Sequence, residues 1–419
     1  MQRWQLASPR TTTFLLGAAA LSLVVSIIVF PAEAFTASLK GLNLWWKLVF
    51  PALLPFLILT ELMRGLGLLH AVGVLLEPLL RTLFRLPGAG GWAMALGFTA
   101  GMPAGASAVS LLRREGLVTR EEGERLLSVS HLMSPVFLIG IIGAGFLHDP
   151  TAGLALASLH YAAALILALL HRFRSKGEPL TARAGSGGLF RRSADACRDA
   201  VVRDGRTFGK LLGDSVTASI QQLFVIGGCM MMFSVLLQVV SLSNLVPALG
   251  RAASMLGLSG ADLASLLASL LPGVFEPHLG AFAIVQHPAW LADPWCYALL
   301  SLLLGWGGFS AHAQVKSLTA ATDLRFGGFL LSRLAHGGIA SLLTLIAWEP
   351  LNAWLGGTEQ AARAAFLPGL GTGWSATRDS LWPLVSPMML QFGTVLLLLL
   401  VLSVFAAFLF YRHRKSPDS

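Results

Sequence analysis

Apolar runs of about twenty residues recur along this chain of 419 residues, and they restrict its fold more than any other feature. A helix needs about 20 mostly apolar residues to cross a bilayer. Only 12% of the residues are charged, which is about half the share of a soluble domain. We therefore predict an all-α polytopic membrane protein with about eight transmembrane helices, at residues 12–30, 42–63, 127–147, 151–170, 215–242, 295–315, 326–348 and 381–410.

Two further apolar segments are long enough to enter the membrane but are interrupted near the middle. Residues 89–112 contain "GMPAGA" and residues 261–284 contain "FEPHLGA", so glycine and proline break both helices. A shorter amphipathic stretch, suited to the membrane interface, precedes each segment at 68–86 and 244–258. Broken backbone at membrane depth persists only where protein buries it or water reaches it, so we predict two re-entrant broken-helix hairpins.

The order of these elements divides the chain into two similar halves. Residues 41–170 and 211–350 each hold a long helix, an interfacial helix, a broken segment and two more helices. A basic cytoplasmic linker at 171–210 separates the halves, and we expect it to be solvated near acidic lipid. Residues 1–40 hold the first transmembrane helix, and residues 351–419 hold an external loop, the last transmembrane helix and a basic tail.

Positive charge sets the expected orientation. Cytoplasmic loops of membrane proteins carry an excess of lysine and arginine. With both termini in the cytoplasm, most of the 30 Lys and Arg residues fall on the inner side. The net charge of +9 is then explained by basic residues at the cytoplasmic membrane face and does not indicate nucleic-acid binding. This orientation inverts the second repeat relative to the first, as in many secondary transporters. The sequence "AEA" at 32–34 leaves open whether the first helix is cleaved.

Five motifs between about residues 40 and 348 carry a family resemblance: "WWKLVFPALLPFLILTELM", "GMPAGAS", "SHLMSP", "FEPHLGA" and "GGFSAHAQVKSL". In order and spacing they resemble the sporulation integral membrane proteins of the YlbJ type. These belong to the nucleoside-recognition (Gate) superfamily, together with concentrative nucleoside transporters. The resemblance implies a multi-pass cell membrane transporter of endospore formers. It also implies dipicolinate, a small aromatic dicarboxylate, as the substrate. The sequence does not distinguish the outer from the inner forespore membrane.

The resemblance also implies that the two hairpin tips and the two following helices contact the substrate. We add Arg333, which lies inside a span, because a guanidinium pairs bidentately with carboxylate. A charge at mid-bilayer costs about 3 kcal/mol on insertion scales, so ionisable groups there indicate function. The predicted substrate-binding residues are Gly101, Pro103, Gly105, Ser107, Ser130, His131, Ser134, Glu276, His278, Ser310, His312, Gln314 and Arg333.

Each of these assignments has a structural alternative. Glu276 and His278 are also placed to cap a helix end in the hairpin. Arg333 is also placed to form a buried ion pair with Glu276 or another acid. His131 is also suited to a hydrogen bond between helices. Gly105 continues a small-residue face with four-residue spacing, which favours close helix packing.

The predicted function is secondary transport of a small anionic aromatic metabolite. The alternatives are a nucleoside transporter and a non-transporting scaffold for spore envelope assembly. The first hairpin lacks the polar Gln/Thr/Glu cluster of nucleoside carriers. An enzyme is not expected, because HExxH and GxSxG motifs are absent. Ser310 and His312 could nevertheless meet Ser134 and His131 in space.

We expect no cofactor, and the three scattered cysteines give no metal-site spacing. The expected partners are the small anionic substrate and the lipid bilayer. The sequence leaves open whether the protein forms a homo-oligomer and which ion, if any, is coupled to transport.

Overall fold

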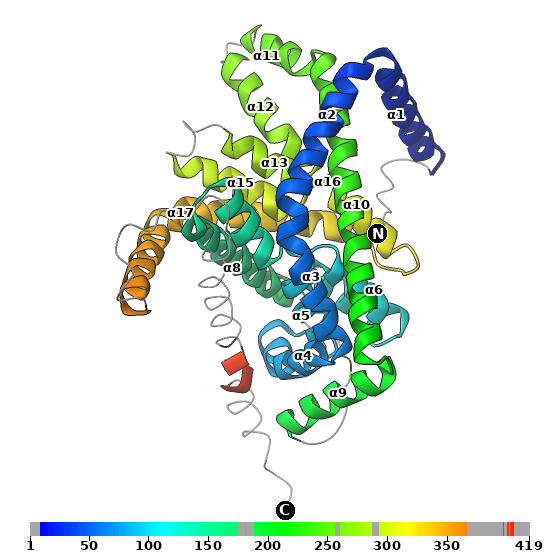
Figure 1. The fold of residues 1–419 in the computed structure, drawn as a ribbon, viewed down its shortest axis with the longest axis vertical. Coiled ribbons are helices and arrows are strands. Elements are labelled where there is room, and N and C mark those ends of the chain that lie inside the picture. The colour runs from blue at the N-terminus through cyan, green and yellow to red at the C-terminus, as the bar shows by residue number, and fades with distance from the viewer. Residues whose placement is uncertain are drawn as a thin grey trace, which may run out of the picture.

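A computed structural model of the chain describes residues 9–174, 181, 188–255, 260–286 and 293–366, and several residues between 397 and 405. Every regular element in these residues is helical (Figure 1). The first predicted span corresponds to helix α1, Pro9–Val29. Most of the last predicted span, 381–410, lies outside the described residues.

Four helices of the described part are long and apolar enough to cross a membrane: Pro31–Gly65, Pro150–Phe173, Phe208–Leu242 and Phe326–Gly356. The first is continuous through α2 (Pro31–Leu44), the π-helical segment η1 (Trp45–Val49) and α3 (Phe50–Gly65). The others are α8 (Pro150–Arg174), α10 (Phe208–Leu242) and α17 (Phe326–Phe366). The protein is therefore a polytopic membrane protein.

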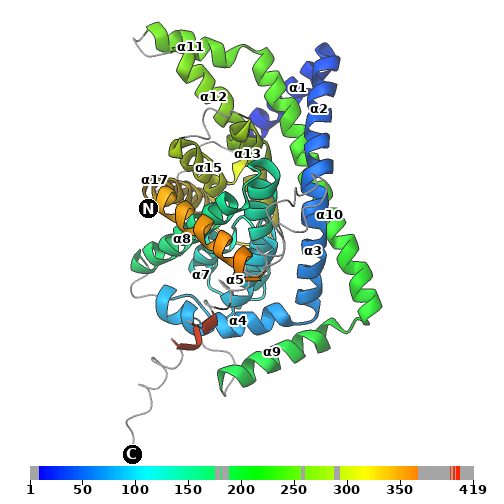
Figure 2. The same cartoon turned by 60° about the vertical axis from the view of Figure 1, so that its left-hand side comes forward.

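Helix α10 runs beside α2 and α3 in both views (Figures 1 and 2). Trp45 joins these helices, because its indole Nε1 donates to the Leu223 carbonyl at 3.0 Å. Gly227 of α10 faces the Trp45 ring, and a Cβ there would lie 2.6 Å from the ring atoms. The absence of a side chain lets the two long helices approach closely.

Short helices occupy both ends of the long axis. Helix α4 (Leu68–Leu79), continued by η2 (Leu80–Phe84), turns away from α3 at Gly67, whose φ is +73°. Helix α11 (Leu245–Met255) follows α10 at the opposite end (Figure 2). These helices correspond to the two amphipathic stretches predicted ahead of the hairpins.

Both predicted broken segments form helical hairpins in the structure. In hairpin 1, α5 (Gly90–Ala100) packs against α6 (Ala104–Arg114). In hairpin 2, α12 (Gly260–Phe275) packs against α13 (Pro277–Val285). The hairpins lie toward opposite ends of the molecule (Figure 2).

Two predicted spans, 127–147 and 295–315, are not continuous helices, and this part of the prediction was wrong. The first is divided into α7 (Arg120–Ser130) and π-helical η3 (Val136–Phe146). Pro135 lacks an amide proton and disfavours helical backbone at Ser134, so the chain opens before it. The second is divided into α15 (Pro294–Trp306) and α16 (Gly308–Leu318). Gly307 and Gly308 have φ of +85° and +75°, and a right-handed helix ends where φ is positive.

The basic linker is more ordered than the sequence predicted. Helix α9 (Leu189–Asp204) lies within it and packs against α4. Arg192 of α9 is buried and forms an ion pair with the buried Glu77, which also accepts from Arg81 at 2.8 Å. A buried carboxylate needs such partners, so Glu77 holds this part of the linker on the protein.

Candidate functional site

The tip of hairpin 1 touches both of the broken helices that the sequence missed. A Cβ on Gly101 would lie 2.8 Å from the Ser134 backbone nitrogen in the α7–η3 break. Gly101 has a φ of +75°, a conformation that suits glycine. A Cβ on Gly307, in the α15–α16 break, would lie 3.4 Å from the Met102 sulfur.

The tip of hairpin 2 meets the same region. A Cβ on Gly308 would lie 2.9 Å from the Phe275 carbonyl oxygen and 3.1 Å from Cα of Glu276. The Trp306 indole also donates to the Val274 carbonyl at 3.0 Å. Two hairpin tips and two helix breaks therefore converge in space, although they are separated by up to about half of the chain.

A small cavity of about 40 Å³ lies where these segments meet. Its volume is enough for about one water molecule. Ligand pockets for metabolites are typically much larger, at about 300–1,000 Å³. The cavity is therefore too small for such a ligand in this structure. Ten residues line the cavity: Leu53, Leu57, Ala100, Met102, Met133, Ser134, Phe137, Gln222, Ile226 and His278.

Gln222 of α10 is a cavity residue that the sequence analysis missed. Its amide nitrogen is buried and has no hydrogen-bond partner in the described part of the chain. The polar pair Gln221–Gln222 interrupts an otherwise apolar span, and that interruption was the available signal. An unpartnered amide donor at a cavity wall is suited to a carbonyl or carboxylate oxygen.

Glu276 performs the structural role that the sequence left open. It caps α13, accepting from the Leu279 backbone N–H at 2.8 Å, and it is only 2% exposed. Its other oxygen lies 2.7 Å from Nδ1 of His278. His278 lines the cavity and packs edge-on against Phe137, with ring centroids 4.5 Å apart. The cap therefore also orients an imidazole at the cavity wall.

Arg333 is directed at backbone carbonyls and has no carboxylate partner in the described residues. Its NH1 donates to the His131 carbonyl at 2.5 Å, and its NH2 donates to the Ser128 carbonyl at 2.9 Å. The side chain is 1% exposed. The alternative of an ion pair with Glu276 is therefore not realised here, and the assignment as a substrate ligand stays a prediction.

Three further polar residues around the α7–η3 break escaped the sequence analysis as site residues. His160 accepts from the Met133 backbone N–H at 3.3 Å through Nε2, and the Tyr161 hydroxyl donates to the Met133 carbonyl at 2.8 Å. His336 lies 2.7 Å from Arg333 NH2. The adjacent polar pair His160–Tyr161 inside an apolar span was a usable signal.

The remaining hairpin 1 and α7 residues are mostly packing positions. Gly105 lies directly against the Ser130 carbonyl, so a side chain there would clash with backbone. The Ser130 hydroxyl donates to the Leu126 carbonyl at 2.7 Å. Pro103 is the N-cap residue of α6 at the tip, and Ser107 is exposed. Only the tip of this hairpin reaches the cavity.

The α16 residues form a separate group next to the cavity. His312 Nδ1 contacts the Gly308 carbonyl at 2.5 Å, and Gln314 donates to the Ser310 hydroxyl at 3.3 Å. His312 and His131 both pack against Phe329, with centroid distances of 5.4 and 5.2 Å.

The catalytic alternative required a serine close to one of these histidines. Within the described residues, no hydrogen bond joins Ser134 or Ser310 to His131 or His312. The arrangement that the enzyme hypothesis needed is therefore not formed.

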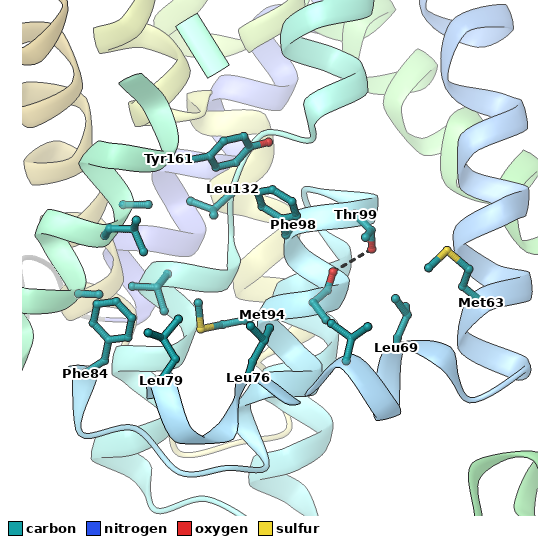
Figure 3. Close-up of a pocket in the computed structure, with 16 residues that line it drawn as sticks. Met63, Leu69, Leu76, Leu79, Phe84, Met94, Phe98, Thr99, Leu132 and Tyr161 are labelled. Carbon is teal, nitrogen blue, oxygen red and sulfur yellow. Dashed lines mark hydrogen bonds between the residues drawn. The ribbon is translucent and has the colours of Figure 1, made fainter. Parts of the chain in front are cut away.

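A larger cavity of about 90 Å³ lies between α3, α4, α5, α7 and α8 (Figure 3). Its walls are almost entirely apolar. Its two polar side chains already donate hydrogen bonds to the backbone. Thr99 donates to the Ala95 carbonyl and Tyr161 to the Met133 carbonyl, both at 2.8 Å. This cavity offers no free donor to an anion, so the smaller one is the better candidate site.

The comparisons with known proteins agree with this architecture. A family model named Gate, described as nucleoside recognition, matches residues 46–184, which include hairpin 1 and the α7–η3 break. The sporulation integral membrane protein YlbJ of Bacillus subtilis (strain 168) is 37% identical over 352 residues, covering 82% of this chain and 85% of the relative. The chain belongs to the YlbJ family of sporulation integral membrane proteins. The resemblance stated from the five motifs is confirmed, and the YlbJ-family match extends across both halves.

Proposed function

We propose that this YlbJ-family protein is a secondary transporter of a small anionic aromatic metabolite, with dipicolinate as the first substrate to test. The observation that carries the proposal is that two hairpin tips and two broken helices converge, with a small cavity lined by both hairpin tips and the α7–η3 break. Broken helices at a shared site are typical of secondary transporters. The relative is a sporulation integral membrane protein, which supports a role in spore formation.

The proposed topology has inverted repeats and both termini in the cytoplasm. The positions of the hairpins at opposite ends of the long axis support inversion (Figure 2). The excess of lysine and arginine in alternate loops supports the orientation. In this arrangement the cavity lies near the middle of the membrane.

The charges around the cavity favour an anion. The oxygens of Glu276 are already engaged by the Leu279 N–H and by Nδ1 of His278. Arg333 lies close behind the α7–η3 break and has no acidic partner in the described residues. Gln222 adds a free amide donor. Because Arg333 is hydrogen-bonded to backbone carbonyls, it supplies a positive field near the α7–η3 break and not a free ligand, and that field favours an anion.

The direct test is binding and flux with purified protein. We expect dipicolinate to raise the melting temperature in detergent and to move across proteoliposomes, and Ser134→Ala to weaken both effects. Ser107→Ala is the matched control, because this serine is exposed on the same hairpin region. A ligand at about 100 times its Kd stabilises by about 2.7 kcal/mol, which is readily measured. Absence of binding and flux across several pH and sodium conditions would contradict the proposal.

A nucleoside is the second candidate substrate, because the matching family model is described as nucleoside recognition. The same measurements with uridine and adenosine distinguish the two candidates. The scaffold alternative makes a different prediction, namely that substitutions at the cavity leave sporulation intact while changes in α9 impair it.

A further inference from the structure

The backbone at the α7–η3 break is supplied with hydrogen-bond partners by side chains from α8 and α17. The last carbonyls of a helix have no partner within the helix. Here the Ser128 and His131 carbonyls accept from Arg333, and the Met133 carbonyl accepts from Tyr161. These carbonyls are therefore already in use in the structure.

The position of Arg333 also matches the electrostatics of a helix end. A helix C-terminus carries partial negative charge and is stabilised by a cation. The Arg333 guanidinium lies at the end of α7, 1% exposed, with the face of Phe329 5.9 Å from its Cζ atom. No carboxylate of the described chain lies within ion-pair distance of it, so the helix end is its main electrostatic partner.

The neighbouring histidine fixes the orientation of this guanidinium. Arg333 NH2 lies 2.7 Å from Nδ1 of His336. Because a guanidinium can only donate, Nδ1 must accept, and the ring is the neutral Nε2–H form. Its Nε2–H then donates to the His160 carbonyl at 2.9 Å. Arg333 is thus held in one position by groups from three elements.

We infer that Arg333 is the resident cation of the α7–η3 break and takes the place of a free metal cation there. In many transporters, unwound carbonyls and half-helix C-terminal ends coordinate a coupling ion. In this chain a covalently attached guanidinium already satisfies two such carbonyls. The inference predicts that the break has no requirement for sodium, and that deleting the guanidinium creates one. It does not depend on the proposed function.

The test is chemical rescue of Arg333→Ala in the purified full-length chain. We expect this variant to lose several degrees of melting temperature and to regain most of the loss with millimolar guanidinium or ethylguanidinium. Urea, which is planar but neutral, should not restore it. Sodium should stabilise the variant more than choline at equal ionic strength, whereas the wild type should not distinguish the two cations.

Arg325→Ala is the matched control, since Arg325 is exposed, precedes α17 and pairs with Glu124 at 2.7 Å. Rescue of both variants to the same extent, or rescue by urea, would overturn the inference. A sodium-specific stabilisation of the wild type that disappears in Arg333→Ala would overturn it as well. If Arg333→Ala does not fold, Arg333→Lys and Arg333→Met replace it. The Arg333→Lys variant must then have a clearly higher melting temperature than the Arg333→Met variant. Equal melting temperatures would reject a cationic role.

Discussion

The α7–η3 and α15–α16 breaks follow the two hairpins in the same order, but different contacts hold them open. At α7–η3 the partners come from distant parts of the chain. Arg333 reaches the His131 carbonyl across 202 positions, and Tyr161 reaches the Met133 carbonyl across 28 positions. The first break begins at Pro135 and is held open by the packing of α8 and α17 against α7.

The second half relies more on nearby residues, although the Trp306 indole also reaches the Val274 carbonyl across 32 positions. Glu276 caps the N–H of Leu279 three positions later, and His312 contacts the Gly308 carbonyl four positions earlier. Gly307 and Gly308 supply the left-handed conformations themselves. The comparison indicates that the first break is a fixed support of the fold. Hairpin 2, which meets the second break, carries the Glu276–His278 pair at the cavity wall and is better placed to respond to a ligand.

The largest expected effect comes from the packing of the hairpins. Gly105 of hairpin 1 lies against the Ser130 backbone of α7, whereas Gly280 of hairpin 2 lies against Gly273 within its own hairpin. Gly105→Ala should force hairpin 1 away from the first break and lower the free energy of unfolding by about 3 kcal/mol. Gly280→Ala should instead separate α12 from α13 and leave the first break intact.

The measurement is thermal unfolding together with cysteine accessibility at each hairpin tip. Gly228→Ala is the control, because its α10 position has open space for a Cβ. An alanine there is expected to be neutral or to stabilise by up to about 1 kcal/mol. If cysteines at both hairpin tips became equally accessible in the Gly105→Ala variant, the two halves would not differ in how their hairpins are held.

A smaller effect is expected at Glu276. Glu276→Ala removes the α13 cap and should lower stability by about 1–2 kcal/mol. It should also abolish dipicolinate transport at unchanged membrane abundance, checked by blot. Glu276→Gln keeps an acceptor oxygen for the Leu279 N–H, so both the cap and substrate binding should persist.

Asp293 provides the matched control for Glu276. It also caps a helix ahead of a proline, accepting from Trp295 N–H at 2.9 Å, but it is exposed. Asp293→Ala should therefore affect stability alone. Full transport by a well-expressed Glu276→Ala variant would leave this carboxylate with a purely structural role.

This difference between local and distant contacts also explains what the sequence could predict. Four of the long apolar helices, both hairpins and the cap at Glu276 depend on residues that are close in sequence, and the structure contains them. The Thr119 capping box at the start of α7 is another local feature that is present. Such elements can be predicted because their causes lie within a few residues.

The two broken helices and the order within the linker could not be found in the same way. Residues 127–147 are apolar enough to span, and although Pro135 marks the break locally, the contacts from Arg333, His160 and Tyr161 that hold the open form come from distant residues. Helix α9 is held against α4 by the ion pair between Arg192 and Glu77, which are 115 positions apart. The roles of these residues depend on tertiary packing, which periodicity and composition do not contain.

The smallest effect is expected where the two halves join outside the membrane-spanning helices. Two reciprocal ion pairs connect them at this face. Arg113 of α6 pairs with Asp323 at 2.7 Å, and Glu124 of α7 pairs with Arg325 at 2.7 Å. Because these pairs are exposed, salt should weaken them, and a relative movement of the halves would break them together.

The hydrogen bond from Arg113 lowers the pKa of the Asp323 carboxyl below its usual value. A group whose pKa is depressed by folding contributes stability above its unfolded pKa, which is about 3.9 for aspartate, and loses it as pH falls through the folded pKa. The wild type should therefore lose slightly more melting temperature than Asp323→Asn between pH 7 and pH 3. Asp195→Asn on α9 is the control, since its pair with Arg198 lies within one helix and does not join the halves. An identical acid response of the wild type and Asp323→Asn would mean that this pair does not hold the two halves together.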